Sequence, residues 1–443
     1  MRSRFLGSLL LLLVLVTSQT IYAKSNPEML ARQATSADAP AAARAISELR
    51  DLGPEGLQAL RQVYADEINR QAANPLLATT ADWQRLSLAL DTVSRQKDSY
   101  LSGLYWYTDF DQAKAAARAA GKPIISLRLL GNLNEEFSCA NSRFFRTILY
   151  SNEEIARTLR EKFILHWESV RPAPRVTIDF GDGRKLERTL TGNSIHYVLD
   201  ADGRPLDALP GLYGPAAFLR ELKGIEGLLQ QLAKKENSNL VQWVSLYQSD
   251  RLNKVNLRWL TDIEKLGGKI PAGFVVRRSE DGTPTALQIA SLAITKMATE
   301  ASMLRSMTAG PEALGAVTDE AAWKKIALFH IADARLDSRS IGLIQRQTQK
   351  AFRAESADIN SETTLARLVE KLEMNIAMDT VRNEYLMHTK LYAWLITDRS
   401  RSDLDVLNKK VYAELFLTPA SDPWLGLFSP ETYVALDGAG VSR

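Results

Sequence analysis

The sequence predicts an α/β domain at residues 101–235, flanked by an α-helical region on each side. Residues 124–130 and 163–167 are short apolar runs typical of buried strands, and residues 195–206 have the pattern of a β-hairpin. The flanking residues 24–100 and 236–443 instead carry apolar residues three and four positions apart, which indicates amphipathic helices. A chain of 443 residues has room for two or three domains, because single cores stop growing at about 250–300 residues.

Residues 1–23 are predicted to be a secretory signal peptide. Arg2 and Arg4 precede a twelve-residue apolar run, and Ala23 supplies a small residue at the expected cleavage site. The run is shorter than the roughly 20 residues that a membrane-spanning helix needs. We therefore expect an exported protein, periplasmic or secreted, with no membrane span after cleavage. An uncleaved anchor is the alternative.

The composition and the motifs limit the classes of function. Without the leader the chain carries 53 basic and 52 acidic side chains, so a nucleic-acid surface is not expected. The sequence has no Walker loop, no Gly-x-Ser-x-Gly and no Gly-x-Gly-x-x-Gly, so nucleotide use and serine-hydrolase chemistry have no support. No cofactor is predicted. Cys139 is the single cysteine, so its thiol is buried, paired with another molecule or functional.

The N-terminal region, residues 24–100, is predicted to be helical. Residues 41–49 and 57–68 have helical apolar spacing, and Gly53 with Pro54 forms a corner between them. This arrangement resembles one HEAT-like unit. A helical hairpin packed on its neighbour is the expected form, because no second copy follows at a fixed period; a true repeat array is the alternative. A further helix is expected at residues 83–93.

The elements of the central domain follow one another closely. Thr108 is expected to cap an alanine-rich helix that Gly121 closes, and the strand at residues 124–130 comes next. Cys139 then stands where a loop gives way to a helix. A capping box beginning at Ser151 opens a helix that runs to about Lys162. Residues 176–190 are predicted to form a β-hairpin around the turn Gly-Asp-Gly, either docking a partner or acidic ligand or serving as a charged, solvated edge.

The order of strand, cysteine-bearing helix, strand, hairpin and helix resembles the thioredoxin-like fold. Members of that family carry Cys-x-x-Cys on the first turn of the helix, and a cis-proline faces the thiol. Here the tetrad from Cys139 to Ser142 is Cys-x-x-Ser, and Asn193 and Ser194 stand where a Thr-Pro pair is usual. The resemblance thus implies the fold, whereas a thiol without a resolving cysteine cannot complete dithiol exchange alone.

These substitutions define a candidate site of four residues: Cys139, Ser142, Asn193 and His196. If Ser194 occupies the proline position, His196 lies two residues along the same strand and on the same face. Cys139, His196 and Asn193 would then be a nucleophile, a base and an orienting amide for acyl transfer. Monothiol redox chemistry with Ser142 is a second interpretation. The third is structural, with Cys139 and His196 packed in the core.

The C-terminal region, residues 236–443, is predicted to be an irregular helical bundle with its own core. Residues 267–284 form a linker or loop before helices at 287–307, 321–336, 340–352 and 364–397. The apolar stretch 418–428 is expected to pack across the bundle. Glu384 and His388 lie four apart on one helical face, where a shared metal or a simple i,i+4 contact is possible; no metal site is predicted.

The function expected from these features is a binding or scaffolding role in the cell envelope, with an unknown protein partner. The thioredoxin-like domain would then be a platform without redox activity. The alternative is a thiol-dependent enzyme that uses Cys139, either in monothiol disulfide exchange with Ser142 or in acyl transfer with His196.

Overall fold

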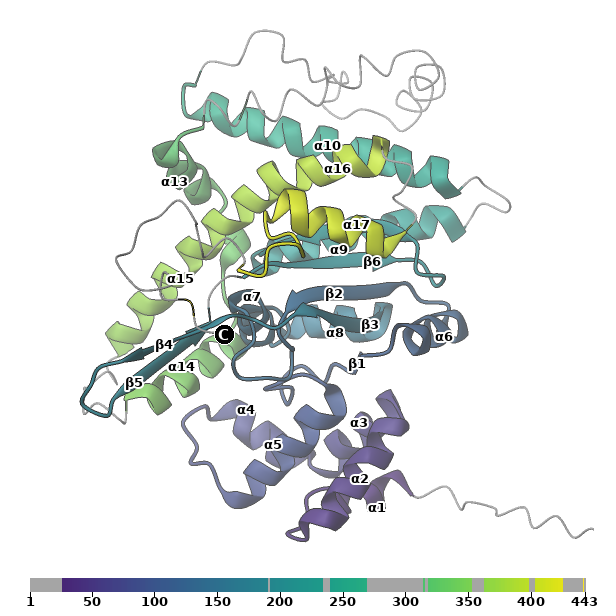
Figure 1. Ribbon diagram of the computed structural model, residues 1–443, viewed down its shortest axis with the longest axis vertical. Helices are drawn as coiled ribbons and strands as arrows, with labels where there is room; N and C mark the ends of the chain where they lie inside the picture. Colours follow the sequence, from purple (N-terminus) through teal and green to yellow (C-terminus); the bar gives the residue numbers. More distant parts are fainter. Residues whose placement is uncertain are drawn as a thin grey trace, which may run out of the picture.

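The computed structural model describes residues 26–189, 192–233, 240–268, 314, 318–352, 362–397, 403–424 and 441. The predicted leader, most of the predicted linker and the predicted helix at 287–307 lie outside these residues. The described chain is a mixed α/β structure, with a five-stranded sheet at its centre and helices around it (Figure 1). In this view the N-terminal helices lie below the sheet, and the C-terminal helices lie above it and to its left.

The central sheet has the strand order β1-β3-β2-β6-β7. Strands β1, β3 and β2 are parallel, β6 is antiparallel to β2, and β7 is antiparallel to β6. The strands predicted at residues 124–130, 163–167 and 195–206 are therefore confirmed. The bounds are β1 (Trp106–Tyr107), β2 (Ile124–Leu130), β3 (Ile164–Arg171), β6 (Ser194–Leu199) and β7 (Pro205–Pro210).

Strand β2 is the centre of the sheet, and all seven of its residues are buried. A strand buried on both faces is a nearly continuous apolar run, which is the pattern of this segment. Its two polar side chains have partners on β3. The Ser126 hydroxyl lies 2.8 Å from Nδ1 of His166, and the Arg128 guanidinium pairs with Glu168. Both polar side chains of β2 therefore keep a hydrogen bond, whereas Nε of Arg128 has no partner.

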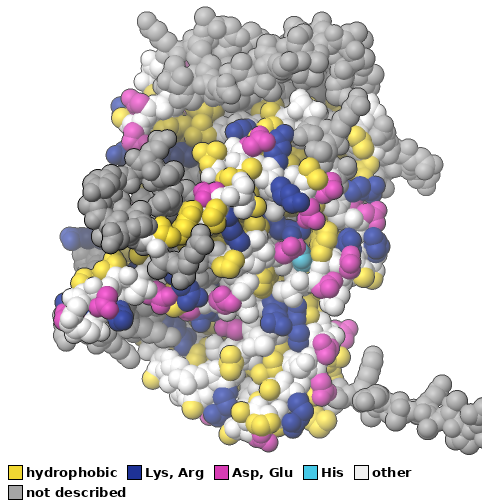
Figure 2. All heavy atoms as spheres, in the orientation of Figure 1, with side chains coloured by type: hydrophobic (Ala, Val, Ile, Leu, Met, Phe, Trp, Pro, Cys, Tyr) yellow, Lys and Arg dark blue, Asp and Glu magenta, His cyan; other side chains and the backbone are white. Residues whose placement is uncertain are grey.

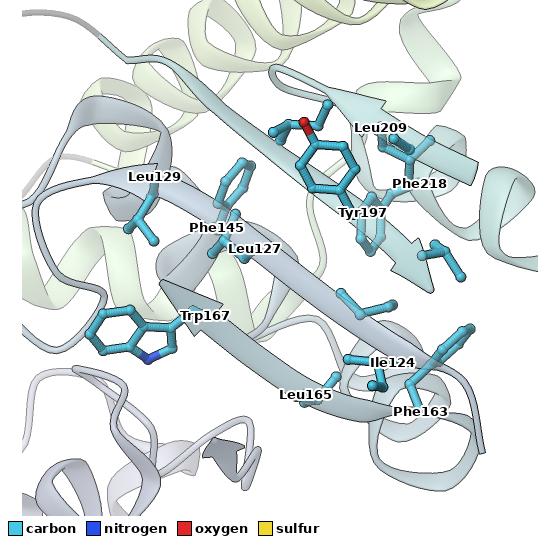
Figure 3. Close-up of a cluster of buried hydrophobic side chains, with 14 of the residues drawn as sticks. Ile124, Leu127, Leu129, Phe145, Phe163, Leu165, Trp167, Tyr197, Leu209 and Phe218 are labelled. Atoms are coloured by element: carbon cyan, nitrogen blue, oxygen red, sulfur yellow. The ribbon is translucent and has the colours of Figure 1, made fainter. Parts of the chain in front are cut away.

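Opposite faces of the sheet are covered by helices from different parts of the chain. On β6, Tyr197 points to one face and donates a hydrogen bond to Asn408 of α17 (Leu404–Lys410). His196 points to the other face, where it meets Phe218 of α9 (Pro215–Ala233). Figure 3 shows apolar side chains of the strands together with Phe145 and with Phe218 of α9 in this core. A C-terminal helix therefore completes a sheet formed by residues 106–210.

The helices of the central domain begin one residue later than predicted. The cap of α6 is Asp109, whose carboxylate accepts from the Gln112 amide at 2.8 Å, and the predicted Thr108 cap is wrong. The cap of α8 is Asn152, because the Ser151 hydroxyl donates to the Thr147 carbonyl instead. The predicted end of α6 at Gly121, with φ 62°, is confirmed. These helices are α6 (Phe110–Ala120), α7 (Ala140–Phe144), the π-helical segment η1 (Phe145–Leu149) and α8 (Glu153–Lys162).

The predicted hairpin insertion is confirmed as a separate two-stranded ribbon. Strands β4 (Arg175–Asp179) and β5 (Lys185–Thr189) are antiparallel and pair with each other, outside the five-stranded sheet. In Figure 1 the ribbon extends to the lower left of the molecule.

The N-terminal region forms its own hydrophobic core from five helices. The predicted pair of helices around the Gly53 corner is present, but the second predicted helix is divided at Tyr64. The helices are α1 (Pro27–Gln33), α2 (Ala39–Asp51), α3 (Pro54–Val63), α4 (Ala65–Ala73) and α5 (Ala81–Ser94).

Gly56 of α3 lies against the Leu49 carbonyl of α2, and we expect alanine there to lower the free energy of unfolding by about 1–3 kcal/mol. A Cβ atom at Gly56 would stand 1.9 Å from the Leu49 carbonyl oxygen, so the helices must separate. Gly227 of α9 is the matched control, because its Cβ would meet nothing within 4 Å. Gly227→Ala should be neutral or stabilise by up to about 1 kcal/mol. Urea denaturation of both variants measures the difference, and equal effects would contradict this packing.

The C-terminal helices contribute to several cores, and Leu343 of α14 belongs to that of the N-terminal region. Helices α10, α13 and α15 form one hydrophobic cluster, which includes the aromatic side chains of Trp259, Trp323 and Tyr385. Residues of α16 and α17 instead belong to the core of the central sheet. The bundle is therefore continuous with the α/β domain. The bounds are α10 (Leu240–Lys265), α13 (Glu320–Phe329), the 3₁₀ turn η2 (Ile331–Ala334), α14 (Ser338–Phe352), α15 (Glu362–Arg382), η3 (Asn383–His388), α16 (Thr389–Thr397) and η5 (Val411–Leu415).

The stretch after η5 packs against the central sheet rather than across the bundle. The Arg171 guanidinium at the end of β3 donates to the carbonyls of Thr418 at 2.7 Å and Asp422 at 3.0 Å. The predicted packing across the bundle is therefore wrong for the described part of this stretch. We call residues 411–424 the C-terminal strap.

Candidate functional site

Cys139 lies at the start of α7, directly after the loop that leaves β2. Its amide donates to the Leu130 carbonyl at 3.3 Å, and its Sγ accepts from the Ser142 amide at 3.4 Å. The residue is completely buried. The predicted position of the thiol at a helix N-terminus is therefore confirmed, but solvent does not reach it.

The charge state of the thiol depends on two opposing influences. Burial raises the pKa of Cys139, whereas the Ser142 amide and the Arg143 guanidinium lower it. Burial prevails, so the pKa stays above the ordinary cysteine value and the thiol is protonated at neutral pH. Since the thiolate is the nucleophile, Cys139 is weakly reactive in this conformation.

Ser142 does not replace a resolving cysteine in contact with the thiol. Its side chain is fully buried, and its hydroxyl has no hydrogen-bond partner. The neighbouring Ser138 hydroxyl is also buried without a partner. Two buried hydroxyls, those of Ser138 and Ser142, therefore lie near the start of α7 in the sequence without a hydrogen-bond partner.

The structure brings the first turn of α7 next to the segment that begins β6, as the resemblance leads one to expect. The Asn141 side-chain amide donates to the Ser194 hydroxyl at 2.9 Å. Asn193 faces the C-terminal strap instead: its amide donates to the Thr418 hydroxyl at 3.0 Å, and its carbonyl accepts from the Tyr412 hydroxyl at 3.3 Å. Peptide bonds are trans throughout the described residues, that between Asn193 and Ser194 included.

His196 is engaged away from the thiol. Its Nε2 lies 2.7 Å from the Tyr150 hydroxyl, and its ring packs against Phe145 and Phe218 with centroids 4.6 Å and 5.2 Å away. Burial lowers the pKa of His196 to about 3, so the ring is neutral. The described hydrogen bonds of His196 do not include one to Cys139, so the arrangement needed for acyl transfer is not formed in this conformation.

The C-terminal strap contacts the candidate site at Asn193. Tyr412 and Thr418 bind Asn193, and Arg171 holds the backbone of the strap through two carbonyls. Burial, and after it Cys139, raises the pKa of Tyr412. Sequence reasoning missed Arg171, Tyr412 and Thr418 as site residues; the only signal was that the stretch from Thr418 is too apolar for a free tail.

A second polar cluster, the buried charge cluster, lies where β7 meets the C-terminal helices. It comprises Asp207, Glu221, Arg251, Glu384 and His388, and sequence reasoning assigned no cluster to these residues. Arg251 forms an ion pair with Glu221, whose side chain is 1% exposed. Glu384 pairs with Arg258, and a guanidinium nitrogen of Arg220 lies 3.5 Å from it.

Asp207 is the acidic centre of this cluster. Its Oδ2 accepts from the hydroxyls of Tyr247 at 2.7 Å and Tyr392 at 3.3 Å. Burial opposes ionisation, but His388 and Arg251 lower the pKa of Asp207 below its usual value. Asp207 is therefore ionised inside the protein, and the Arg251 guanidinium is among the groups that favour its charge.

Glu384 and His388 do not converge on a common metal position. Glu384 faces the guanidinium groups, whereas Nδ1 of His388 lies 3.2 Å from the Tyr213 hydroxyl and Nε2 lies 3.6 Å from Asp207. In the part of the chain that the structure describes, no group of three or more histidine, cysteine or acidic side chains could hold a metal ion. The close pairs of this cluster are structural contacts between elements.

Figure 2 shows the surface of the molecule in the orientation of Figure 1. In its described part, Lys and Arg side chains are interspersed with Asp and Glu. Across the described residues, no helix combines the length and apolar character needed to cross a membrane.

Comparison with protein-family models, curated proteins and solved structures finds no match to this chain.

Proposed function

We propose that this protein is an exported binding or scaffolding protein of the cell envelope, with a thioredoxin-like domain that serves as a platform and performs no thiol chemistry. The observation that carries the proposal is the complete burial of Cys139 at the start of α7. A redox or acyl-transfer thiol must meet its substrate, and this thiol is enclosed by its own chain. Export rests on the predicted leader at residues 1–23.

The strand order supports the thioredoxin-like assignment. Parallel β1, β3 and β2, antiparallel β6 and β7, and a cysteine-bearing helix after β2 follow the order that the resemblance implies. Between β3 and β6, where the family has a helix, this chain has the ribbon β4–β5, and α17 covers a face of the sheet. A platform role agrees with a sheet whose faces are filled by the protein's own helices.

The alternative is a thiol-dependent enzyme that uses Cys139 with Ser142 or His196. The contact between Asn141 and Ser194 favours it, because this contact places the thiol-bearing turn beside the segment that faces the thiol in the family. This activity requires the strap to leave Asn193 and the His196 ring to turn away from Tyr150.

Alkylation of Cys139 in the intact native protein distinguishes the two proposals. We expect iodoacetamide to react at neutral pH about a hundredfold more slowly than in denaturant, because the thiol is buried and protonated. Arg171→Ala removes the contacts that hold the strap, so it should accelerate alkylation about tenfold. Arg204→Ala is the matched control, because Arg204 pairs with Asp200 in an exposed turn.

The contrary result is rapid alkylation of the native wild-type protein at or below neutral pH. That outcome would replace the platform by a reactive thiol. If Arg171→Ala and Arg204→Ala alkylate at the same slow rate, the strap does not control access to the thiol, and the packing of α7 alone protects it.

A further inference from the structure

The ribbon β4–β5 has one apolar face and one polar face. Val176, Ile178 and Leu186 share the apolar face with Arg188, because Ile178 lies opposite Leu186, Val176 lies opposite Arg188 and side chains alternate along each strand. Phe180 continues this face beyond β4. Ile178 is 46% exposed and Phe180 is 54% exposed. A two-stranded ribbon with an exposed apolar face is marginally stable by itself and gains stability from further strands.

The hydrogen bonds of the ribbon determine which backbone groups are available at the outer edge of β4. The Phe180 amide donates to the Arg184 carbonyl at 3.1 Å, so these residues form a hydrogen-bonded pair. Such pairs recur at every second residue of an antiparallel ladder, which directs Val176 and Ile178 toward β5. The amides and carbonyls of Arg175, Thr177 and Asp179 therefore point outward. In the described residues, no further strand pairs with this edge.

We propose that a second copy of this chain pairs with that edge, so that β4 of each copy lies antiparallel to β4 of the other with Thr177 on the two-fold axis. In this register Arg175 lies opposite Asp179 of the second copy, and Val176 lies opposite Ile178 of the second copy. The three residues with outward backbone groups face one another, as a hydrogen-bonded ladder requires. The charges are complementary, and the two apolar faces join on one side of a four-stranded sheet.

The outer edge of β5 does not offer the same match. A two-fold pairing centred on Glu187 would set two glutamates directly opposite each other, which is unfavourable. Pairing through β4 also gives the outward backbone groups of β4 hydrogen-bond partners without changing the ion pairs inside the ribbon. In these pairs the Lys185 ammonium lies 3.1 Å from the Asp179 carboxylate, and the Arg175 guanidinium lies 3.4 Å from the Glu187 carboxylate. The inference does not depend on the chemistry of Cys139, so it can fail while the proposed function stands.

A cysteine at position 177 tests the register. Residues opposite each other in a hydrogen-bonded pair have Cα atoms about 5.5 Å apart, within the range of about 4.4–6.8 Å that a disulfide spans. The only native cysteine is buried. We expect Thr177→Cys to form a reducible dimer on mild oxidation, and Asp182→Cys, in the exposed turn of the same ribbon, to remain largely uncrosslinked. Equal crosslinking of the two variants would overturn the register.

Proline substitutions test the edge, with the mass of the intact mature protein in solution as the readout. Thr177→Pro removes an outward amide and leaves the bonds inside the ribbon, because proline is tolerated where a strand's N–H faces away from its neighbour. We expect the wild-type protein and Glu187→Pro to be dimers and Thr177→Pro to be a monomer. A monomeric wild-type protein, or a dimer that Thr177→Pro preserves, would overturn the proposal; in the first case a strand of a different protein becomes the candidate for this edge.

Discussion

Replacement of Arg251 by alanine is expected to lower the free energy of unfolding by about 3–5 kcal/mol. Arg251 is the ion-pair partner of Glu221, and its charge also lowers the pKa of Asp207. The two carboxylates are essentially unexposed, so they cannot exchange the lost cation for water. Urea denaturation followed by circular dichroism measures the loss.

Two further variants distinguish the buried pair from a general loss of arginine. Arg204→Ala removes an exposed arginine that pairs with Asp200, and we expect a change of less than about 1 kcal/mol. Combining Arg251→Met with Glu221→Leu removes both charges and retains apolar volume, so it should cost less than Arg251→Ala alone. If Arg251→Ala and Arg204→Ala have the same effect, the cluster does not stabilise the junction between α9 and α10.

Acid is expected to destabilise the protein through its buried histidines. Burial lowers the pKa of His196 to about 3, and burial and then Arg128 lower the pKa of His166 to about 3. The unfolded chain binds these protons near pH 6.5. Between these values the unfolded state binds more protons than the folded state, so stability is full above pH 6.5 and falls as the pH decreases. From pH 7 to pH 5 the loss is about 2 kcal/mol for each histidine.

His196→Gln measures this contribution, because glutamine keeps a hydrogen-bonding group for Tyr150 but does not titrate. The free energy of unfolding of this variant should depend less steeply on pH between 6.5 and 5 than that of the wild-type protein. The comparison is made between variants because Asp91, whose pKa burial raises to about 7, titrates with the opposite sign. Parallel pH profiles would show that His196 binds a proton in the folded state as readily as in the unfolded chain.

The sequence predicts a strand well where burial on both faces requires a continuous run of apolar residues. The run at residues 124–130 is apolar because β2 is covered on both faces, and the Gly-Asp-Gly turn allows only a tight connection between β4 and β5. Helix starts are less certain, because Thr108 and Asp109 can each cap a helix. Only the folded geometry selects Asp109.

The candidate site was predicted only in part. Alternation along β6 places His196 on the same side as Ser194, but it does not show that η1 brings Tyr150 to the imidazole. The contact between Asn193 and Tyr412 joins residues 219 positions apart. Neither residue has a local pattern that indicates the other. The buried charge cluster was missed for the same reason, since Glu221 and Arg251 each resemble an ordinary solvated position on a helix.

The position of α17 on the central sheet has a consequence for synthesis. All five strands are translated before α17, whose Leu404 and Leu407 belong to the sheet core. While the ribosome is still making the helices in between, the apolar surface that α17 will cover faces water. A nascent chain that cannot close its core early stays unfolded longer, and this is the state in which a secretory translocon accepts its cargo.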